Sequence, residues 1–274
     1  MVIWQAGASS GLGLHTARQL AFSGMTVVCG ARSYENDETF RDGRHQLYLD
    51  VRNEASVERF VEKALQIAGA PDALVCTQGL LVLGACEDYT DQDLMDVMDT
   101  NFFGQVRLIR QVLPIFRKNG HGRIVLFSSV NGVLGIPFQG AYTASKHAIE
   151  GFAEALRMEV RPFNVSVMVV EPGDHQSGSG KYRKHTHSGE KGSPYYERYH
   201  LATARIAHDE EHGSDPDRLG KRIVKALNKK RLPAKLLIAS PDQKLAVLLH
   251  RLLPARMFSG IISSYYRRTT GSLQ

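Results

Sequence analysis

The sequence predicts an α/β fold in which a single doubly wound parallel sheet is flanked by helices. Short β-type runs alternate with helical patterns from residue 2 to residue 172. The β-type runs are almost entirely apolar, as expected for strands that helices cover on both faces. A glycine-rich turn joins the first run to the first helical segment. Alternation at this spacing indicates βαβ units and therefore a parallel sheet.

The elements follow one another in a regular order, and we find no internal repeat. Strands are expected at VIWQA (2–6), MTVVCGA (25–31), HQLYLDV (45–51), DALVCTQ (72–78), RIVLFSS (123–129) and VSVMVVEP (165–172). Helices are expected at 12–23, 56–69, about 91–119 and about 142–161. We therefore expect one domain over residues 1–274.

Two segments beyond the last strand differ from this pattern. Residues 173–216 are rich in Gly, Ser, His and charge, and predict a mobile loop with a short helix near 194–206. Ligands of open α/β sheets bind at the carboxyl ends of strands, so this segment is a candidate substrate lid. Residues 240–268 alternate apolar and basic side chains, which predicts an amphipathic helix interrupted at Pro254. That helix either packs on the body or a partner subunit, or docks on an anionic membrane surface.

Composition limits the classes of function. The chain has 274 residues, 43% hydrophobic and 23% charged, which is ordinary for a soluble globular protein. The net charge is +6, but residues 213–274 hold 13 Lys and Arg against three Asp, so the basic excess is C-terminal. No nucleic-acid recognition motif or aromatic-interleaved basic groove accompanies it, so nucleic-acid binding is not expected.

Cysteine usage and the chain start predict a cytoplasmic protein, with peripheral membrane contact as the alternative. The three cysteines are odd in number and include no C-x-x-C pair, which excludes a disulfide framework. No signal peptide and no run of about 20 apolar residues is visible. His185 and His187 have a spacing that suits a metal, but no carboxylate or third histidine is paired with them. We therefore expect no metal site.

The run GASSGLG (7–13) lies between the first strand and the first helix. Its glycines bring the backbone close to a pyrophosphate, and the helix N–H groups and dipole favour the phosphates. A purely structural glycine-rich turn is the alternative. The candidate cofactor-binding residues here are Gly7, Ser9, Ser10, Gly11, Leu12 and Gly13.

Arg32 follows the second strand, where NAD enzymes commonly carry an acidic residue for the ribose 2′-hydroxyl. No acidic residue appears before Glu35. Arg32 can form a charge-assisted pair with a 2′-phosphate instead, which favours NADP(H) over NAD(H). NAD(H) remains an alternative, with Arg32 as a solvated loop residue.

Tyr142 and Lys146 are four residues apart near the start of a predicted helix, so they share one face. A free tyrosine has a pKa near about 10 and is a poor acid–base catalyst, but a nearby cationic lysine lowers that pKa. Such a pair is common by chance. Ser129 ends a strand shortly before it, and its hydroxyl can bind a substrate oxygen.

The order of these motifs resembles the short-chain dehydrogenase/reductase family, whose fold is Rossmann-like, over residues 2 to about 177. The resemblance implies that Tyr142 is the acid or base, that Lys146 lowers its pKa and binds the nicotinamide ribose, and that Ser129 orients the substrate oxygen. It also implies that Asn101 in TNFFG supports a water-linked proton relay. Further cofactor contacts implied by position are Asp50, Val51, Gly79, Pro172, Gly173 and Ser177.

Two departures from the family pattern carry structural expectations. Cys76-Thr77-Gln78-Gly79 replaces the usual Asn-Asn-Ala-Gly, and the bulkier Gln78 is expected to crowd the ribose. The first strand carries Trp4-Gln5-Ala6 and lacks the usual threonine. We expect the loss of its hydroxyl to weaken the link between the turn and the neighbouring strand.

The resemblance implies an NADP(H)-dependent oxidoreductase that interconverts an alcohol and a ketone or aldehyde. The runs NFFGQVRLIRQVLP and YTASKHAIEGFAEALRMEV are similar to enzymes of steroids and retinoids, which suggests a lipophilic substrate. The family also suggests a homodimer or homotetramer with the Tyr142-bearing helix at an interface. A catalytically weak NADP(H)-binding scaffold or redox sensor is the alternative function.

Overall fold

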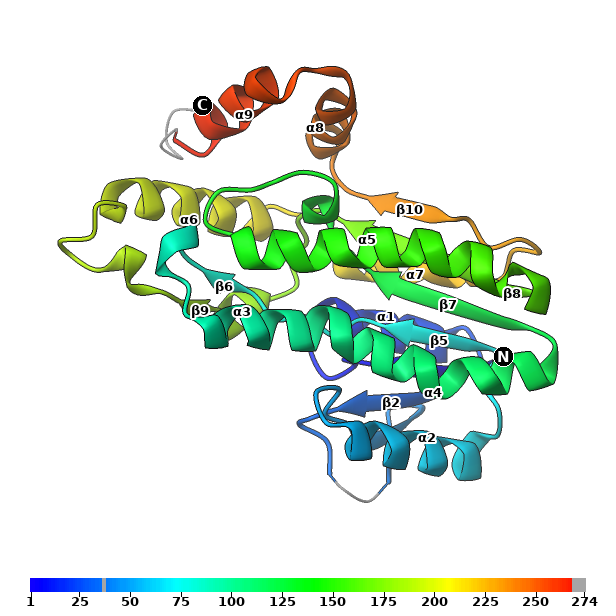
Figure 1. Ribbon diagram of the computed structural model, residues 1–274. Coiled ribbons are helices and arrows are strands. Elements are labelled where there is room, and N and C mark those ends of the chain that lie inside the picture. The colour runs from blue at the N-terminus through cyan, green and yellow to red at the C-terminus, as the bar shows by residue number, and fades with distance from the viewer. Residues whose placement is uncertain (36–37, 268–274) are drawn as a thin grey trace.

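An eight-stranded sheet with helices on both faces forms the centre of the chain, which confirms the predicted α/β class (Figure 1). The computed structural model describes residues 1–35 and 38–267, so Arg268, the last residue of the expected C-terminal segment, lies outside the described residues. The strands of this sheet are β1 (Val2–Ala6), β2 (Thr26–Ala31), β3 (Thr39–Arg41), β4 (Arg44–Tyr48), β5 (Ala73–Cys76), β7 (Gly122–Phe127), β8 (Val165–Pro172) and β10 (Lys235–Ile238).

The strand order is β10-β8-β7-β5-β1-β2-β4-β3, and every neighbouring pair is parallel except β3 with β4. The chain moves outward from β1 to β2 and β4, then returns to β5 on the other side of β1. Ala6 accordingly pairs with Gly30 on one side and with Cys76 on the other. Ligands bind at such a reversal point, beyond the carboxyl ends of the strands.

The helices cover both faces of the sheet and extend beyond its end. They are α1 (Gly11–Phe22), α2 (Glu54–Ala68), α3 (Asp91–Met98), α4 (Gly104–Asn119), α5 (Gly140–Val160), α6 (Tyr196–Glu211), α7 (Pro216–Leu227), α8 (Pro241–Leu252) and α9 (Ala255–Tyr265). The helix expected over 91–119 is α3 and α4 joined by a π-helical turn, Asp99–Phe103. No helix in the described ranges is long and apolar enough to cross a membrane.

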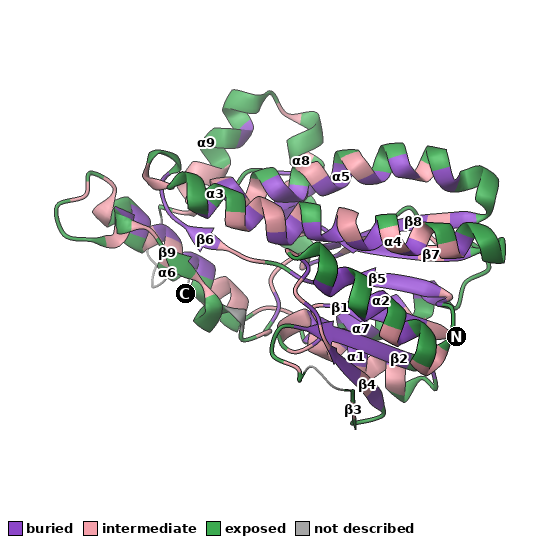
Figure 2. Ribbon diagram, turned by 60° about the horizontal axis from the view of Figure 1, so that its bottom comes forward, coloured by how far each residue is buried: buried purple, intermediate pink, exposed green. Residues whose placement is uncertain are grey.

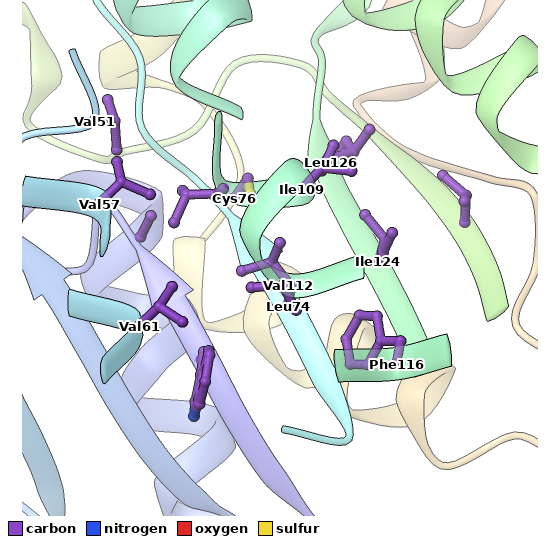
Figure 3. Close-up of a cluster of buried hydrophobic side chains, with 14 of the residues drawn as sticks. Val51, Val57, Val61, Leu74, Cys76, Ile109, Val112, Phe116, Ile124 and Leu126 are labelled. Carbon is purple, nitrogen blue, oxygen red and sulfur yellow. The ribbon is translucent and has the colours of Figure 1, made fainter. Parts of the chain in front are cut away.

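Two hydrophobic clusters hold the helices to the sheet, because successive strand residues point to opposite faces. Trp4 and Leu74 belong to the cluster that α2, α4 and α5 cover, which Figure 3 shows with Phe116 of α4 beside Ile124 of β7. Ile3, Val27 and Val75, which point to the opposite face, belong to the second cluster, beneath α1 and α7. The all-apolar strands of the sequence are therefore the centre of a three-layered body.

The sequence did not predict several short strands. β10 and the antiparallel β3 add to the edges of the main sheet. β6 (Val82–Leu83) and β9 (Lys184–His185) form a separate two-stranded parallel sheet. These strands have two to four residues, too few for an alternating pattern to show.

The segment 173–216 contains more secondary structure than the predicted loop, while its mobility stays a prediction. The short helix expected near 194–206 is α6, a longer element of 16 residues. Leu81 and Leu83 accept backbone hydrogen bonds from the segment at 3.4 and 2.9 Å. These bonds run from Lys184 and Thr186, so the segment is tied to the chain that follows β5.

The expected C-terminal amphipathic segment is present as a hairpin. α8 ends at Leu252 and α9 begins at Ala255, so the chain turns at Leu253 and Pro254. Proline at this place ends the first helix because it lacks the N–H that would continue it. Figure 2 shows α8 and α9 projecting from the body with largely exposed outer surfaces.

Candidate active site

A cavity of about 610 Å³ opens at the carboxyl ends of the central strands. It lies at the reversal point between β1 and β5, where the topology predicts a ligand. The cavity brings together every predicted site residue except Asn101. These lining residues are Gly7, Ser9, Ser10, Gly11, Leu12, Gly13, Arg32, Asp50, Val51, Gly79, Ser129, Tyr142, Lys146, Pro172, Gly173 and Ser177.

The glycine-rich turn can hold a pyrophosphate. Gly7 and Gly11 have φ values of +78° and +52°, which side chains other than glycine rarely adopt. A Cβ on Gly13 would lie 2.0 Å from the Gly7 carbonyl oxygen, so only glycine lets α1 pack here. Within the described chain, Ser10 gives α1 no side-chain cap and the first helical turn carries no acidic residue. The helix N–H groups therefore face the cavity as an anion-binding site.

A threonine hydroxyl connects the glycine-rich turn to the neighbouring strand, although the sequence predicted that this connection would be lost. Thr77 Oγ1 donates to the carbonyl oxygens of Ala6 at 2.6 Å and Gly7 at 3.1 Å. Gln5 Nε2 donates to the Gly13 carbonyl oxygen at 2.7 Å and to Thr77 Oγ1 at 3.3 Å. The expectation of a weakened link is therefore wrong, because Thr77, directly after the neighbouring strand β5, supplies the hydroxyl.

Gln78 is the departure that lies in the wall of the cavity. Its backbone packs against the turn so closely that a Cβ on Gly7 would lie 2.5 Å from the Gln78 nitrogen. Its side chain is buried, and among the described residues neither amide atom has a hydrogen-bond partner. The amide is therefore available to a ligand in the cavity. Crowding of the ribose by Gln78 stays a prediction.

Charged residues lie in the part of the cavity next to β2 and the residues after β4. Arg32 follows β2 and is exposed at the cavity edge. Asp50 accepts hydrogen bonds from the backbone N–H of Arg52 at 3.0 Å and from its guanidinium at 3.3 Å. Burial raises the pKa of Asp50, but these bonds outweigh it and hold the pKa below its usual value. Sequence reasoning missed Arg52, although it stands directly after the predicted Asp50-Val51 pair.

Ser129 and Tyr142 meet beside β8. Ser129 follows β7, and its Oγ accepts the Asn131 backbone N–H at 3.2 Å and donates to the Pro172 carbonyl oxygen at 3.4 Å. The Ser129 hydroxyl also lies beside the Tyr142 phenol. Burial raises the pKa of Tyr142 to about 12, and the nearby Ser129 hydroxyl opposes this rise. The two hydroxyls therefore face the same part of the cavity.

Lys146 lies beneath Tyr142 on α5. Its Nζ donates to the Phe127 carbonyl oxygen at 2.8 Å and lies 5.3 Å from the centre of the Tyr142 ring. Burial lowers the pKa of Lys146 to about 7, with Glu150 opposing the change. The expectation that Lys146 lowers the pKa of Tyr142 is not met in the protein alone. The reason is that burial disfavours both charged forms.

Asn101 lies behind the cavity wall, in the π-helical turn. Its Oδ1 accepts the Leu80 backbone N–H at 2.6 Å, and its Nδ2 donates to the Leu80 carbonyl oxygen and to Ser145 Oγ, both at 2.9 Å. A Cβ on Gly79 would lie 3.9 Å from Asn101 Oδ1 and 4.0 Å from Lys146 Nζ. Asn101 and Lys146 therefore approach the same point from two helices.

The substrate side of the cavity carries residues that sequence reasoning missed. Arg183 forms an ion pair with Glu210 of α6, and Asp174 follows β8. Burial raises the pKa of Asp174 to about 7, and the nearby carboxylates of Glu210 and Asp209 add to the rise. Apolar and aromatic side chains line the same region, namely Leu81, Ile136, Tyr182, Ile206 and Tyr266. These residues follow the last predicted strand or come from loops, where no motif marked them.

His185 and His187, whose spacing suits a metal, each contact another side chain of the protein. His185 Nδ1 hydrogen-bonds the Tyr199 hydroxyl at 2.5 Å, and His187 Nε2 lies 2.9 Å from the Asp88 carboxylate. In the described ranges, no three His, Cys, Asp or Glu side chains gather in an arrangement that would hold a metal ion.

A dinucleotide-type phosphate turn and a Ser–Tyr–Lys set in one cavity define the class of a nucleotide-dependent oxidoreductase. The short chain dehydrogenase family model matches residues 1–187. The chain belongs to this short-chain dehydrogenase/reductase family, whose members are NAD(P)-dependent oxidoreductases acting on CH–OH groups.

Individual relatives extend the likeness over the whole chain. A 3-ketodihydrosphingosine reductase of Bacteroides thetaiotaomicron is 35% identical over 97% of both chains. The structure of a short-chain dehydrogenase from Streptomyces avermitilis has a TM-score of 0.79 and 28% identity, covering 98% of this chain and 97% of that one. The structure of an actinorhodin polyketide ketoreductase with NADPH has a TM-score of 0.70 and 26% identity, covering 87% and 95%.

Proposed function

We propose that this protein is an NADP(H)-dependent oxidoreductase that interconverts an alcohol and a ketone or aldehyde on a lipophilic substrate. One observation carries the proposal: the Ser129–Tyr142 hydroxyl pair and the anion-binding turn line one continuous cavity. The nicotinamide group, when bound, donates or accepts the hydride. The protein then has to hold the substrate oxygen and move one proton.

Tyr142 is the proposed acid or base. In the reducing direction its phenolic proton passes to the substrate oxygen as the carbonyl carbon gains a hydride, and in oxidation the proton returns. Ser129 Oγ holds the same oxygen by a hydrogen bond. Lys146 stabilises the phenolate when its ammonium is charged and reaches the nicotinamide ribose. Asn101 positions the chain around Gly79 and Leu80 and supports a water-linked relay to Lys146.

The proposed preference for NADP(H) rests on Arg32. Its exposed guanidinium at the end of β2 can take a 2′-phosphate, while no carboxylate of β2 competes for a 2′-hydroxyl. The likeness to a ketoreductase whose structure includes NADPH agrees with this preference. The remaining cofactor contacts are proposed at Gly7 to Gly13, Asp50, Val51, Gly79, Pro172, Gly173 and Ser177. NAD(H) is the alternative cofactor.

The lining of the cavity supports an amphipathic substrate. Leu81, Ile136 and Ile206 offer an apolar wall, whereas Asp174, Arg183 and Glu210 place charge near Tyr142. A long-chain ketone or alcohol with a polar group near the reacting carbon would satisfy both parts. The substrate named for the Bacteroides thetaiotaomicron relative, 3-ketodihydrosphingosine, is of this kind. Residues 173–216 contribute Asp174, Arg183 and Glu210, and we propose that this segment is the substrate lid.

The experiment that tests the proposal is a titration with NADPH and NADH, followed by turnover on a panel of ketones and aldehydes weighted toward long-chain members. We expect tighter NADPH binding and turnover of at least one lipophilic carbonyl. Tight NADH binding with weak NADPH binding would overturn the cofactor preference. Cofactor binding with no turnover across the panel would favour the alternative function, an NADP(H)-binding scaffold or redox sensor. The departure from the family pattern at Gln78, in the cavity wall, is the observation that supports this alternative.

We also propose that the whole chain works as one domain and assembles as a homodimer or homotetramer through α5. Met158 on α5 is 72% exposed, and Phe103, the last residue of the π-helical turn before α4, is also exposed. Contiguous exposed apolar side chains mark contact surfaces, so the proposed interface requires these two residues to belong to one patch. Light scattering of the purified protein tests this part, and a monomer at micromolar concentration would contradict it.

A further inference from the structure

The outer face of the α8–α9 hairpin carries a stripe of large exposed apolar side chains. Leu245, Leu248 and Leu252 are 54%, 51% and 69% exposed, and their spacing places them on one face of α8. Met257 and Ile261 on α9 are 57% and 48% exposed, and are spaced by one helical turn. We call these five residues the hairpin stripe.

The hairpin stripe is a second apolar face, distinct from the one that packs on the body. Val247 of α8 and Phe258 of α9 are buried in a cluster with Val130 and Leu134. A soluble surface helix normally exposes a polar face opposite its packed face. Apolar residues on both sides of the hairpin therefore indicate that something covers its outer side. Figure 2 shows this outer side as exposed.

Basic residues accompany the hairpin stripe. Lys244 and Arg251 are exposed on α8, and Arg256 is exposed at the start of α9. The basic excess of residues 213–274, with 13 Lys and Arg against three Asp, extends the positive charge around them. An apolar stripe flanked by Lys and Arg is the composition of a helix that lies in the interface of an anionic membrane.

We propose that the α8–α9 hairpin docks on the surface of an anionic lipid bilayer, with the hairpin stripe inserted at the boundary between headgroups and acyl chains. A second copy of this chain fits the face less well. In a twofold interface both copies use the same surface patch, so the positive charge of Lys244, Arg251 and Arg256 would be brought against like charge. Phospholipid headgroups with negative charge satisfy both the apolar and the basic residues.

Docking at this place connects the membrane with the cavity. Arg205 of α6 donates to the Tyr265 hydroxyl at 2.5 Å, and that hydroxyl donates to the Asp209 carboxylate at 2.8 Å. The next residue, Tyr266, lines the cavity. A docked hairpin therefore holds the mouth of the cavity beside the bilayer. Entry of a lipid substrate from the bilayer rests on the proposed function, whereas docking itself does not.

The test is flotation of the full-length protein with vesicles of phosphatidylcholine alone or mixed with phosphatidylserine. We expect wild type to float with the mixed vesicles, and Leu248→Ser/Leu252→Ser to partition at least about tenfold less. The matched control is Phe22→Ser/Leu65→Ser, which removes exposed apolar residues of α1 and α2. This control should float like wild type.

The charge is tested separately with Arg251→Glu/Arg256→Glu. We expect this variant, and wild type in high salt, to lose most binding to the mixed vesicles, by roughly fivefold or more per residue.

Wild type that does not float, or hairpin variants that float as well as the control, would overturn the proposal. So would hairpin variants that change the oligomeric state with unchanged flotation, because a second copy would then cover the face. Turnover of a short water-soluble ketone should be the same in all variants, because none of them changes the cavity. A protein that binds the vesicles but reduces no carbonyl compound would contradict the proposed function and leave membrane docking intact.

Discussion

The ammonium of Lys146 lies 5.3 Å from the centre of the Tyr142 ring, on the same face of α5 and against the end of β7. Its Nζ is held by the Phe127 carbonyl oxygen, so the side chain is fixed beneath the ring. Burial acts on the two groups in opposite directions, because it raises the pKa of Tyr142 and lowers that of Lys146. Tyr142 is therefore held in its neutral form at neutral pH, whereas Lys146 changes its charge close to neutral pH.

Tyr142→Phe removes the proposed proton donor and keeps the ring. We expect turnover to fall by about 10²–10⁴-fold, the range typical of a lost general acid or base. The Kd for NADPH should change less than about threefold, because loss of one neutral hydrogen bond is the only change in binding. Steady-state kinetics and fluorescence titration measure the two quantities. Tyr48→Phe, a tyrosine of β4, is the control, and full turnover by Tyr142→Phe would refute the assignment.

The buried Lys146 makes stability depend on pH in a defined direction. Its pKa is about 7 in the folded protein and 10.5 ordinarily, so between these values the unfolded chain binds the extra proton. The free energy of unfolding should therefore rise with pH in this window, by up to about 1.4 kcal/mol per pH unit. Lys146→Met should be more stable than wild type at pH 7 and lack this part of the rise.

Urea unfolding measured from pH 7 to below pH 9 tests this slope. The upper limit avoids the buried thiols of Cys29 and Cys76, whose raised pKa values lower the stability of the protein as the pH rises above 9.0. Lys118→Met, at an exposed position of α4, controls for the loss of one ammonium group. Equal slopes for wild type and Lys146→Met would show that Lys146 is charged in the folded protein.

Arg32→Ala should weaken NADPH binding by roughly 10–100-fold, as expected for one charge-assisted hydrogen-bonding pair. NADH has no 2′-phosphate, so its Kd should change by less than about threefold. Isothermal titration with each cofactor gives the comparison. Arg59→Ala removes an exposed arginine of α2 as the control. Equal loss for both cofactors would mean that Arg32 does not read the 2′-phosphate.

Thr77→Val removes the hydroxyl that links the end of β5 to the turn after β1. The carbonyl oxygens of Ala6 and Gly7 would lose this donor, and we expect a loss of about 1–3 kcal/mol in the free energy of unfolding. Weaker NADPH binding should accompany it, because the same turn holds the phosphates. Thr26→Val, at an exposed place on β2, is the comparison. A stability loss no larger than that of Thr26→Val would remove Thr77 from this role.

Among the departures from the family pattern, the sequence located each position but misjudged one effect. It showed that the threonine of the first strand was missing and that Thr77 and Gln78 were unusual. It did not show that Thr77 contacts Ala6 and replaces the hydroxyl that is missing there, because this contact joins residues 71 positions apart. Only the pairing of β1 with β5 brings them together.

The sequence by itself determined the parallel sheet, the phosphate turn and the Ser129–Tyr142–Lys146 set. Apolar runs, glycine positions and helical spacing are local patterns that need no tertiary contacts to be read. The tertiary structure decided the rest. It placed Asp174, Arg183 and Glu210 beside Tyr142, and it buried Lys146 so that its pKa falls rather than that of Tyr142. Burial and long-range contacts depend on which segments the fold brings together, and no local pattern contains that information.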